Sequence, residues 1–396
     1  MKMTKCLLFC TAVSSFVIAS EYLTCAAEIR GVSKDTIAVG IIVDQSGPAA
    51  AAVTYADAAK NYFRYVNDHG GIHGRKIRLI AEDDRYTIPG AFAAFKKLVF
   101  KDEVLTILAC GGTGQTTALF SSIEKNHMPV NTLSWSWTMT DPVRRYVFTP
   151  GNDNKDEMKI IMDYIVNTLK PKNPRIAVVC PDVEYGKSGT KVARMKAKEH
   201  DVELVKGEII PISAIDLSSQ VLSLKRKKAS HIVSLTITGP TLALLRNSKR
   251  LGYSPVFVGS FHIFEDEVAQ AGGELAKKVY AAGAFGSWFD ETKGVSKLKE
   301  TSLQYTPHMK PPNRYYLKGW ITAKITHEGM KRAGKDLDGQ SLVNALETIQ
   351  NLDMEDLTGP ISYSPTDHKG NDYARMYKAD IKKGYFVPVT GWIRSE

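Results

Sequence analysis

Residues 37–43 read Ile-Ala-Val-Gly-Ile-Ile-Val, an unbroken apolar run of the length expected for a strand buried on both faces. A helical pattern follows over residues 55–67. Its apolar and aromatic members recur at helical spacing: Ala58, Ala59, Tyr62, Phe63 and Val66. Gly70 and Gly71 end this pattern, as glycines commonly do at helix C-termini. A second strand is predicted at 77–81, and strand, helix and strand in this order predict a parallel βαβ unit.

The same alternation continues and then starts again after Phe148-Thr149-Pro150-Gly151. Further strands are predicted at 105–110 and 130–133 in the first half, and at 175–180, 202–209, 231–235 and 256–259 in the second. Helical patterns lie between them at 91–100, 116–126, 157–169, 189–200, 217–227 and 241–251. The remainder is more helical, at 315–333 and 340–349, with short strand-like pieces around 361–363 and 373–379. About 370 residues remain after a leader, which is more than one core usually supports, so two α/β domains are expected.

The N-terminus predicts export. Lys2 and Lys5 precede an apolar run over residues 6–19 and then small residues, which is typical of a signal peptide. We place the signal peptide at 1–27, with cleavage after Ala27 and a periplasmic location. Lipid attachment at Cys25 is the less favoured alternative, because Tyr22-Leu23-Thr24 does not resemble a lipid-attachment box. The run of about 14 residues is too short for a membrane-spanning helix, which needs about 20.

Cysteine content and charge exclude several classes of protein. Three of the five cysteines lie in the leader, and Cys110 and Cys180 fall in different predicted lobes, so no disulfide scaffold is expected. The formal net charge is +10. However, the basic residues are scattered, and the run 225–228 ends a predicted helix without interleaved aromatic residues. We therefore expect no nucleic-acid partner.

No complete catalytic constellation is present. The glycine-rich stretch 111–117 lacks the lysine of a Walker loop and the third glycine of a dinucleotide fingerprint. Its free backbone N–H groups at a helix start suit a carboxylate, although a plain tight turn is an alternative. The stretch 186–190 lacks the second glycine of a nucleophile elbow, and the histidines show no metal-ligand spacing. We therefore predict no enzyme activity, no cofactor and no metal site.

Trp135 and Trp137 directly follow a predicted strand, within Leu133-Ser134-Trp135-Ser136-Trp137-Thr138. Loops at the carboxyl ends of strands are where open α/β sheets bind ligands. Large aromatic side chains with hydroxyls between them suit a small organic ligand that has an apolar body and polar ends. Packing in the core is the competing interpretation for each tryptophan.

Several motifs in a fixed order resemble the leucine/isoleucine/valine-binding family, the type I periplasmic solute-binding proteins of ABC transporters. They are Val39-Gly40 to Ser46-Gly47-Pro48, Asn67 to Ile77, Glu82-Asp83-Asp84, Glu184-Tyr185-Gly186, Asp216 to Gln220, Leu251-Gly252, Leu357 to Ile361 and Asp367-His368. The resemblance implies two Rossmann-like lobes with parallel-type sheets joined by three crossovers, and a ligand trapped in the cleft by hinge closure. We place the crossovers near Pro150, Ala284 and Gly370. This gives lobe I as 28–150 and 285–370, and lobe II as 151–284 and 371–396.

The resemblance also implies the site and the partners. The carboxylate-holding loop corresponds to Thr113 and Gly114, the next loop to Ser134 and Ser136, and the aromatic wall of the second lobe to Tyr185. A small-molecule ligand and the membrane permease of an ABC importer are the implied partners, and a monomer is expected.

One departure from the family pattern affects the predicted ligand. Amino-acid binders of the family place an acidic residue where this chain reads Gly259-Ser260-Phe261-His262. A buried ammonium without a carboxylate is costly. We therefore expect a ligand with a carboxylate or amide end and an aromatic or apolar body facing Trp135, Trp137, Tyr185 and Phe261.

Three alternatives stay open at this stage. A branched-chain or other amino acid would fit if Asp182, Glu184 or Glu265 supplied the missing charge. A ligand-sensing receptor or regulator domain shares the fold, and an exported α/β enzyme is the third class.

Overall fold

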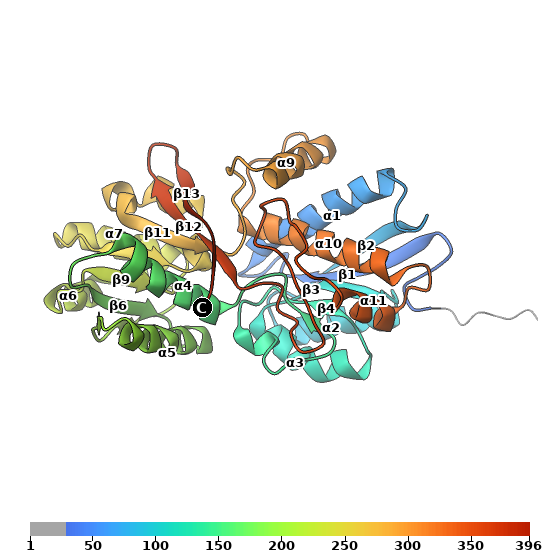
Figure 1. Ribbon diagram of the computed structural model, residues 1–396, viewed down its shortest axis with the longest axis horizontal. Helices are drawn as coiled ribbons and strands as arrows, with labels where there is room; N and C mark the ends of the chain where they lie inside the picture. Colours follow the sequence, from blue (N-terminus) through green and yellow to red (C-terminus); the bar gives the residue numbers. More distant parts are fainter. Residues whose placement is uncertain (1–28) are drawn as a thin grey trace, which may run out of the picture.

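The computed structural model describes residues 29–396, so the predicted signal peptide and Cys25 lie outside the described residues. The chain forms two α/β lobes arranged side by side along the long axis of the molecule (Figure 1). Lobe I, on the right in this view, contains the first sheet, and lobe II contains the second. This confirms the predicted two-lobe architecture. No helix of the described part is both long and apolar enough to cross a membrane.

The sheet of lobe I has the order β2-β1-β3-β4-β5, and all of its strand pairs are parallel. Its strands are β1 (Thr36–Val43), β2 (Lys76–Asp83), β3 (Thr106–Cys110), β4 (Val130–Asn131) and β5 (Val147–Phe148). Helices α1 (Val53–Asp68) and α10 (Arg314–Ala333) cover one side of the sheet, and α2 (Ile88–Phe100) and α3 (Thr113–Lys125) cover the other (Figure 1). Helix α9 (Lys293–Tyr305) packs on α1, and α11 (Gly339–Leu346) packs on α10.

The sheet of lobe II has the order β13-β12-β11-β10-β9-β6-β7, with β8 also paired to β6. Its parallel strands are β6 (Arg175–Cys180), β7 (Glu203–Leu204), β8 (Glu208–Ile209), β9 (His231–Ser234), β10 (Val256–Gly259) and β11 (Val279–Gly283). The C-terminal strands β12 (Tyr373–Asp380) and β13 (Tyr385–Arg394) join it antiparallel. Its helices are α4 (Asn154–Asp163), α5 (Glu184–Glu199), α6 (Ser218–Arg226), α7 (Thr238–Arg250) and α8 (Asp266–Ala271). Helix α4 continues as a π-helical turn over Tyr164–Leu169.

The elements differ from the predicted ones in a few places. The strand predicted at 202–209 is two short pieces, and Gly207 between them passes so close to β6 that a Cβ there would lie 2.0 Å from the Val178 carbonyl oxygen. The strand-like piece at 361–363 forms only an isolated bridge between Ile361 and Leu352. Strand β13 was not predicted; it lies at the edge of the sheet and contains Pro388, which an edge strand tolerates. Strand β11 and helix α9 were also not predicted.

The chain crosses between the lobes in three places: between β5 and α4, between β11 and α9, and before β12. Hydrogen bonds tie two of these segments together. Thr149 N donates to the His368 carbonyl (3.0 Å), and Gly370 N donates to the Thr149 carbonyl (2.9 Å). The segment between β11 and α9 is joined to the stretch before β12 by a third hydrogen bond, in which the Thr358 hydroxyl donates to the Ala284 carbonyl (2.9 Å). The lobe boundaries near Pro150, Ala284 and Gly370 stay predictions, and each falls between elements of the two sheets.

A close approach between α1 and α10 positions the part of α10 that faces lobe II. A Cβ atom at Gly319 would lie 2.2 Å from the Tyr55 carbonyl oxygen, so only glycine fits at this contact. Tyr55 is itself fully buried, and its hydroxyl donates to the Leu108 carbonyl of β3 at 2.5 Å. The depth at which α10 sits in lobe I therefore depends on this glycine.

Substitution Gly319→Ala should lower the thermal unfolding midpoint of the protein, because the new methyl group must push α10 away from α1. Overpacking of this kind costs about 1–3 kcal/mol. Gly391→Ala is the matched control, since a Cβ there meets no atom within 4 Å. Differential scanning calorimetry of both variants would check the expectation, and equal midpoints would contradict it.

Candidate ligand-binding site

The glycine turn after β3 brings three of the predicted site residues together. Helix α3 begins at Thr113, and its N-cap, Gly112, contributes no side chain to cap the first turn. The Thr113 and Ser134 hydroxyls are hydrogen-bonded to each other at 2.7 Å, and the Ser134 hydroxyl also accepts from Ser136 N at 2.9 Å. A Cβ at Gly114 would meet no atom within 4 Å. The turn therefore leaves open space beside uncapped N–H groups, which suits an anion.

Ser136 and Trp137 also interact with other residues of the protein. The Ser136 side chain is the N-cap of the short 3-10 turn Trp137–Met139, and its hydroxyl lies 2.8 Å from that of Thr138. The Lys155 ammonium of α4 lies 3.4 Å from the centre of the Trp137 ring. Trp137 therefore contacts lobe II through a cation–π interaction.

Trp135 forms the main aromatic contact between the lobes. Its ring stacks on Phe261, which follows β10 of lobe II, with centroids 4.1 Å apart and planes inclined by 26°. Phe285 and Tyr315 approach the same indole edge-on. On the lobe II side, Tyr185 packs edge-on against His262 at 5.0 Å. The predicted residues Trp135, Phe261 and Tyr185 thus lie at a single interlobe aromatic cluster, together with His262.

Four charged residues meet at this aromatic cluster, and three of them were not predicted from the sequence. Lys318 and Arg314 come from α10 of lobe I, while Glu157 of α4 and Glu265 belong to lobe II. Lys318 is 2% exposed and Glu157 is 1% exposed. Arg314 forms an ion pair with Glu265 across the lobes, and its guanidinium lies 5.1 Å from the Phe261 ring centre.

Lys318 has an unusual environment for an ammonium group. Its Nζ donates to the Leu133 carbonyl at 3.0 Å and lies 3.5 Å from the centre of the Trp135 ring. Within residues 29–396, no carboxylate lies at ion-pair distance from it. Burial lowers the pKa of Lys318 well below its usual value, Glu157 opposes this shift and Arg314 adds to it.

Glu157 of lobe II is a buried acid, whereas Lys318 of lobe I is a buried base. One carboxylate oxygen, Oε1, accepts from Phe261 N at 3.1 Å. The other, Oε2, has no hydrogen-bond partner in the described part of the chain. Burial raises the pKa of Glu157 to about 8. Burial, reinforced by Arg314 and Lys318, also lowers the pKa of His262 to about 3, so this imidazole is neutral at physiological pH.

Two acidic residues approach the loop 259–262 in the structure, and one of them, Glu265, is among the alternatives that the sequence left open. The loop 259–262 carries no acidic residue, but Glu157 reaches the Phe261 backbone from a helix one hundred residues earlier, and Glu265 approaches from the other side. A signal was present in the sequence. Glu157, Ile160, Ile161 and Tyr164 share one helical face, and all four are buried. A charged residue on an apolar stripe of this kind indicates a functional position.

The comparisons with known proteins agree with this architecture. The family model described as "Periplasmic binding protein" matches residues 36–385. The chain belongs to the periplasmic binding protein family. It is therefore a solute-binding protein, and its two lobes are those of the type I fold.

Similar proteins differ in what they bind. The chain is 23% identical over 296 residues to Leu/Ile/Val-binding protein homolog 7 of Brucella abortus, covering 72% of this chain and 73% of the relative. A branched-chain amino acid ABC transporter protein of Thermus thermophilus with bound valine superimposes with a TM-score of 0.82, at 20% identity, over 92% of this chain and 98% of that one. A fatty acid ABC transporter substrate-binding protein of Thermomonospora curvata gives 0.81, at 22% identity, over 93% and 95%. The shared fold therefore does not decide the ligand.

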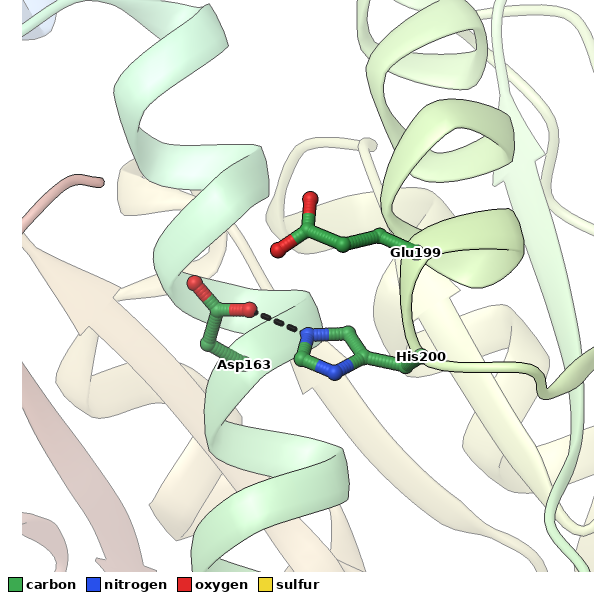
Figure 2. A group of neighbouring side chains, drawn as sticks. All are labelled: Asp163, Glu199 and His200. Atoms are coloured by element: carbon green, nitrogen blue, oxygen red, sulfur yellow. Dashed lines mark hydrogen bonds and ion pairs between the residues drawn. The ribbon is translucent and has the colours of Figure 1, made fainter.

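A separate polar cluster in this solute-binding protein lies at the C-terminal ends of α4 and α5. Asp163, Glu199 and His200 bring one ligand-type atom each within 4.8 Å of one another, and the Asp163 carboxylate contacts the His200 ring (Figure 2). The Lys196 ammonium pairs with both Asp163 (2.9 Å) and Glu199 (2.7 Å). An internal cation thus already neutralises these carboxylates, and the cluster is a structural link between the two helices.

Substitution Phe261→Ala should shift the solute-binding protein toward open conformations, because the stack with Trp135 is lost. An aromatic pair contributes about 0.5–1.5 kcal/mol beyond its buried area. The measurement is the radius of gyration by small-angle X-ray scattering, which should increase. Tyr280→Ala is the control, since it removes an aromatic pair with Tyr164 inside lobe II. An unchanged radius for Phe261→Ala would show that the stack does not hold the lobes together.

Proposed function

We propose that the protein is exported and captures a small organic carboxylate between its lobes for the permease of an ABC importer. The observation that carries this proposal is the buried ammonium of Lys318, which lacks a carboxylate partner in the described part of the chain and lies against Trp135. A ligand carboxylate would supply the missing negative charge. Its apolar or aromatic body would pack on Trp135, Phe261 and Tyr315.

The charge balance of the interlobe cluster supports an anionic ligand. Arg314 is already paired with Glu265, and its Nε is buried without a hydrogen-bond partner in residues 29–396. Lys318 is the second cation at the cluster. Because a buried charge is expensive unless it is paired, the free energy of binding would include relief of the cost at Lys318. The uncapped first turn of α3, with Thr113 and Gly114, adds further hydrogen-bond donors at lobe I.

Glu157 favours a second candidate, an amino acid. Its free Oε2 provides the carboxylate that an α-ammonium group requires, so the physical argument against amino acids no longer holds. In this case the amino acid carboxylate would bind Lys318 while its ammonium bound Glu157. Both candidates share the anchoring of a carboxylate by lobe I.

Further expectations belong to the same proposal. We infer that the chain acts as a monomer and returns its ligand chemically unchanged, as a carrier does and an enzyme does not. Mass spectrometry of a ligand recovered after prolonged incubation checks the second point.

Substitution Lys318→Met should weaken the binding of aromatic carboxylates by at least tenfold. A hydrogen bond to a charged group contributes about 1.5–3 kcal/mol, and 1.4 kcal/mol corresponds to a factor of ten. Dissociation constants would be measured by isothermal titration calorimetry after a thermal-shift screen, in which a ligand at 100 times its Kd adds about 2.7 kcal/mol.

Lys324→Met is the matched control for that measurement. Lys324 lies on the same helix, but its ammonium pairs with Glu355 at 2.7 Å. Its loss should leave affinity unchanged. Binding of the corresponding uncharged amides with equal affinity, or an unaffected Lys318→Met variant, would refute the carboxylate anchor.

A further inference from the structure

Lys369 lies on the third crossover, where the chain returns to lobe II. Its backbone pairs with Thr149 in an isolated parallel bridge, so the first and third crossover segments lie side by side at this point. Thr149 N and Gly370 N donate the hydrogen bonds of this bridge. The Lys369 side chain extends from the bridge to carboxylates at the edge of lobe II.

Three carboxylates surround the Lys369 ammonium, and each stands where an element of lobe II begins. Asp156 lies 2.6 Å away and Asp153 4.0 Å away, both at the start of α4. Asp372, directly before β12, lies 2.7 Å away. The side chains of Lys369 and Asp156 are only 19% and 7% exposed, so water screens their attraction less than it screens a surface ion pair.

Short stretches of chain separate the backbone bridge from these carboxylates. Residues 150–152 connect Thr149 to Asp153, and residues 370–371 connect Lys369 to Asp372. None of these connecting residues belongs to a helix or strand of the described chain. A rotation of the lobes within these stretches would carry the carboxylates of lobe II away from Lys369, whose backbone stays with Thr149.

A polar cavity of about 350 Å³ borders this group of charges. Its walls come from the start of α4, from the loop of lobe I that contains Asp141, and from residues 366–369. Besides Asp156 and Lys369, the charged residues that line it around Asp153 are Asp141, Lys155, Lys159 and Asp367. Asp153 is 14% exposed, so protons reach its carboxylate from solvent while the chain stays folded.

Lys369 compensates carboxylates that are costly to bury. Burial raises the pKa of Asp153 to about 6, Asp156 adds to this shift, and Lys369 opposes it. Burial also acts against the charge of Lys369, but Asp156 and Asp153 together raise the pKa of its ammonium. Without the lysine, two buried carboxylates would lose their cation, which is unfavourable until water reaches them.

We propose that Lys369 acts as an ionic clamp at the crossovers: it ties the starts of α4 and β12 to the third crossover and favours the arrangement with the lobes in contact. The clamp is formed in the arrangement in which Trp135 stacks on Phe261. Lys369 is a positioning residue, because it acts through the two elements of lobe II and not through a ligand. The clamp therefore sets the ratio of closed to open molecules before any ligand binds.

The test measures the distance between the lobes in the ligand-free protein by double electron–electron resonance. Spin labels are attached at Ser121→Cys on α3 of lobe I and Arg194→Cys on α5 of lobe II, which are exposed positions. The native Cys110 and Cys180 are buried. In Lys369→Met, the ratio of open to closed molecules at pH 7.5 should rise about tenfold, which corresponds to about 1.4 kcal/mol.

Three further variants accompany Lys369→Met. Lys369→Arg keeps a cation beside the carboxylates and should restore the wild-type ratio. Lys159→Met is the matched control, because Lys159 lies on α4 and lines the same cavity but forms no ion pair within residues 29–396. Asp372→Asn removes one partner of the clamp and should raise the ratio by a smaller factor, so the proposal can be tested even if Lys369→Met does not fold.

The pH dependence gives a readout that the loss of a packing contact would not produce. Because Lys369 opposes the upward shift of the Asp153 pKa, its removal should raise that pKa further. Lowering the pH from 7.5 to 5 then protonates Asp153 and leaves one buried charge fewer. The closed population of Lys369→Met should therefore recover as the pH falls, and wild type should change by a smaller factor. The other charged residues of the cavity are the same in both proteins: Asp141, Lys155, Asp156, Lys159 and Asp367.

Three outcomes would overturn the clamp. They are an unchanged ratio in Lys369→Met, an equal rise in Lys159→Met or Lys369→Arg, and a rise in Lys369→Met that low pH does not reverse. Thermal unfolding followed by circular dichroism at both pH values checks that each variant is folded. No ligand is added, so these outcomes do not depend on the proposed function.

Discussion

The stack of Trp135 on Phe261 is the contact on which the arrangement of the site depends, because its two rings belong to different lobes. Trp135 follows β4 and Phe261 follows β10, so each lies beyond the carboxyl end of a parallel strand. The two sheets therefore direct their ligand-binding edges toward each other, as open α/β sheets do at such edges. Closing the stack excludes water from its surroundings, and the charges beside it then interact through a medium of low dielectric constant.

The burial of Lys318 and Glu157 is costly for the stability of the folded chain. Each residue is almost completely buried, at a place where an aliphatic side chain would pack without a desolvation penalty. Both pKa shifts, downward for the lysine and upward for the glutamate, express this cost. Violations of local design rules of this kind are expected at functional sites. Arg314, by contrast, is neutralised by Glu265 of the other lobe.

The first turn of α4 couples the crossover region to the site. Asp156 pairs with Lys369, which lies beside the third crossover. Asn154 N donates to the Trp135 carbonyl at 2.9 Å, and the Asn154 side-chain oxygen accepts from Trp137 N at 3.1 Å. Glu157, one turn further, bonds to Phe261 N. A rotation of the lobes about the crossovers would therefore change the position of the Glu157 carboxylate relative to the loop that carries Trp135.

The sequence by itself determined the alternation of strands and helices, the two lobes and the position of most elements, because buried parallel strands and amphipathic helices leave patterns of local periodicity. The motifs shared with the family, their departure at 259–262 and the predicted strand before Trp135 also predicted Thr113, Ser134, Trp135, Tyr185 and Phe261 as site residues. The contact of Trp135 with Phe261, which lie 126 positions apart in the numbering, could not be read from any local pattern.

Only the tertiary structure decided the electrostatics of the site. Arg314 and Lys318 come from a helix that crosses back to lobe I, and Glu157 comes from the helix that follows the first crossover. Their presence at the interlobe cluster depends on which side chains three separate crossovers bring together, and sequence spacing carries no information about that. The same physical reason explains why Glu157, which accepts from Phe261 N although it lies on α4, could not be predicted from the sequence.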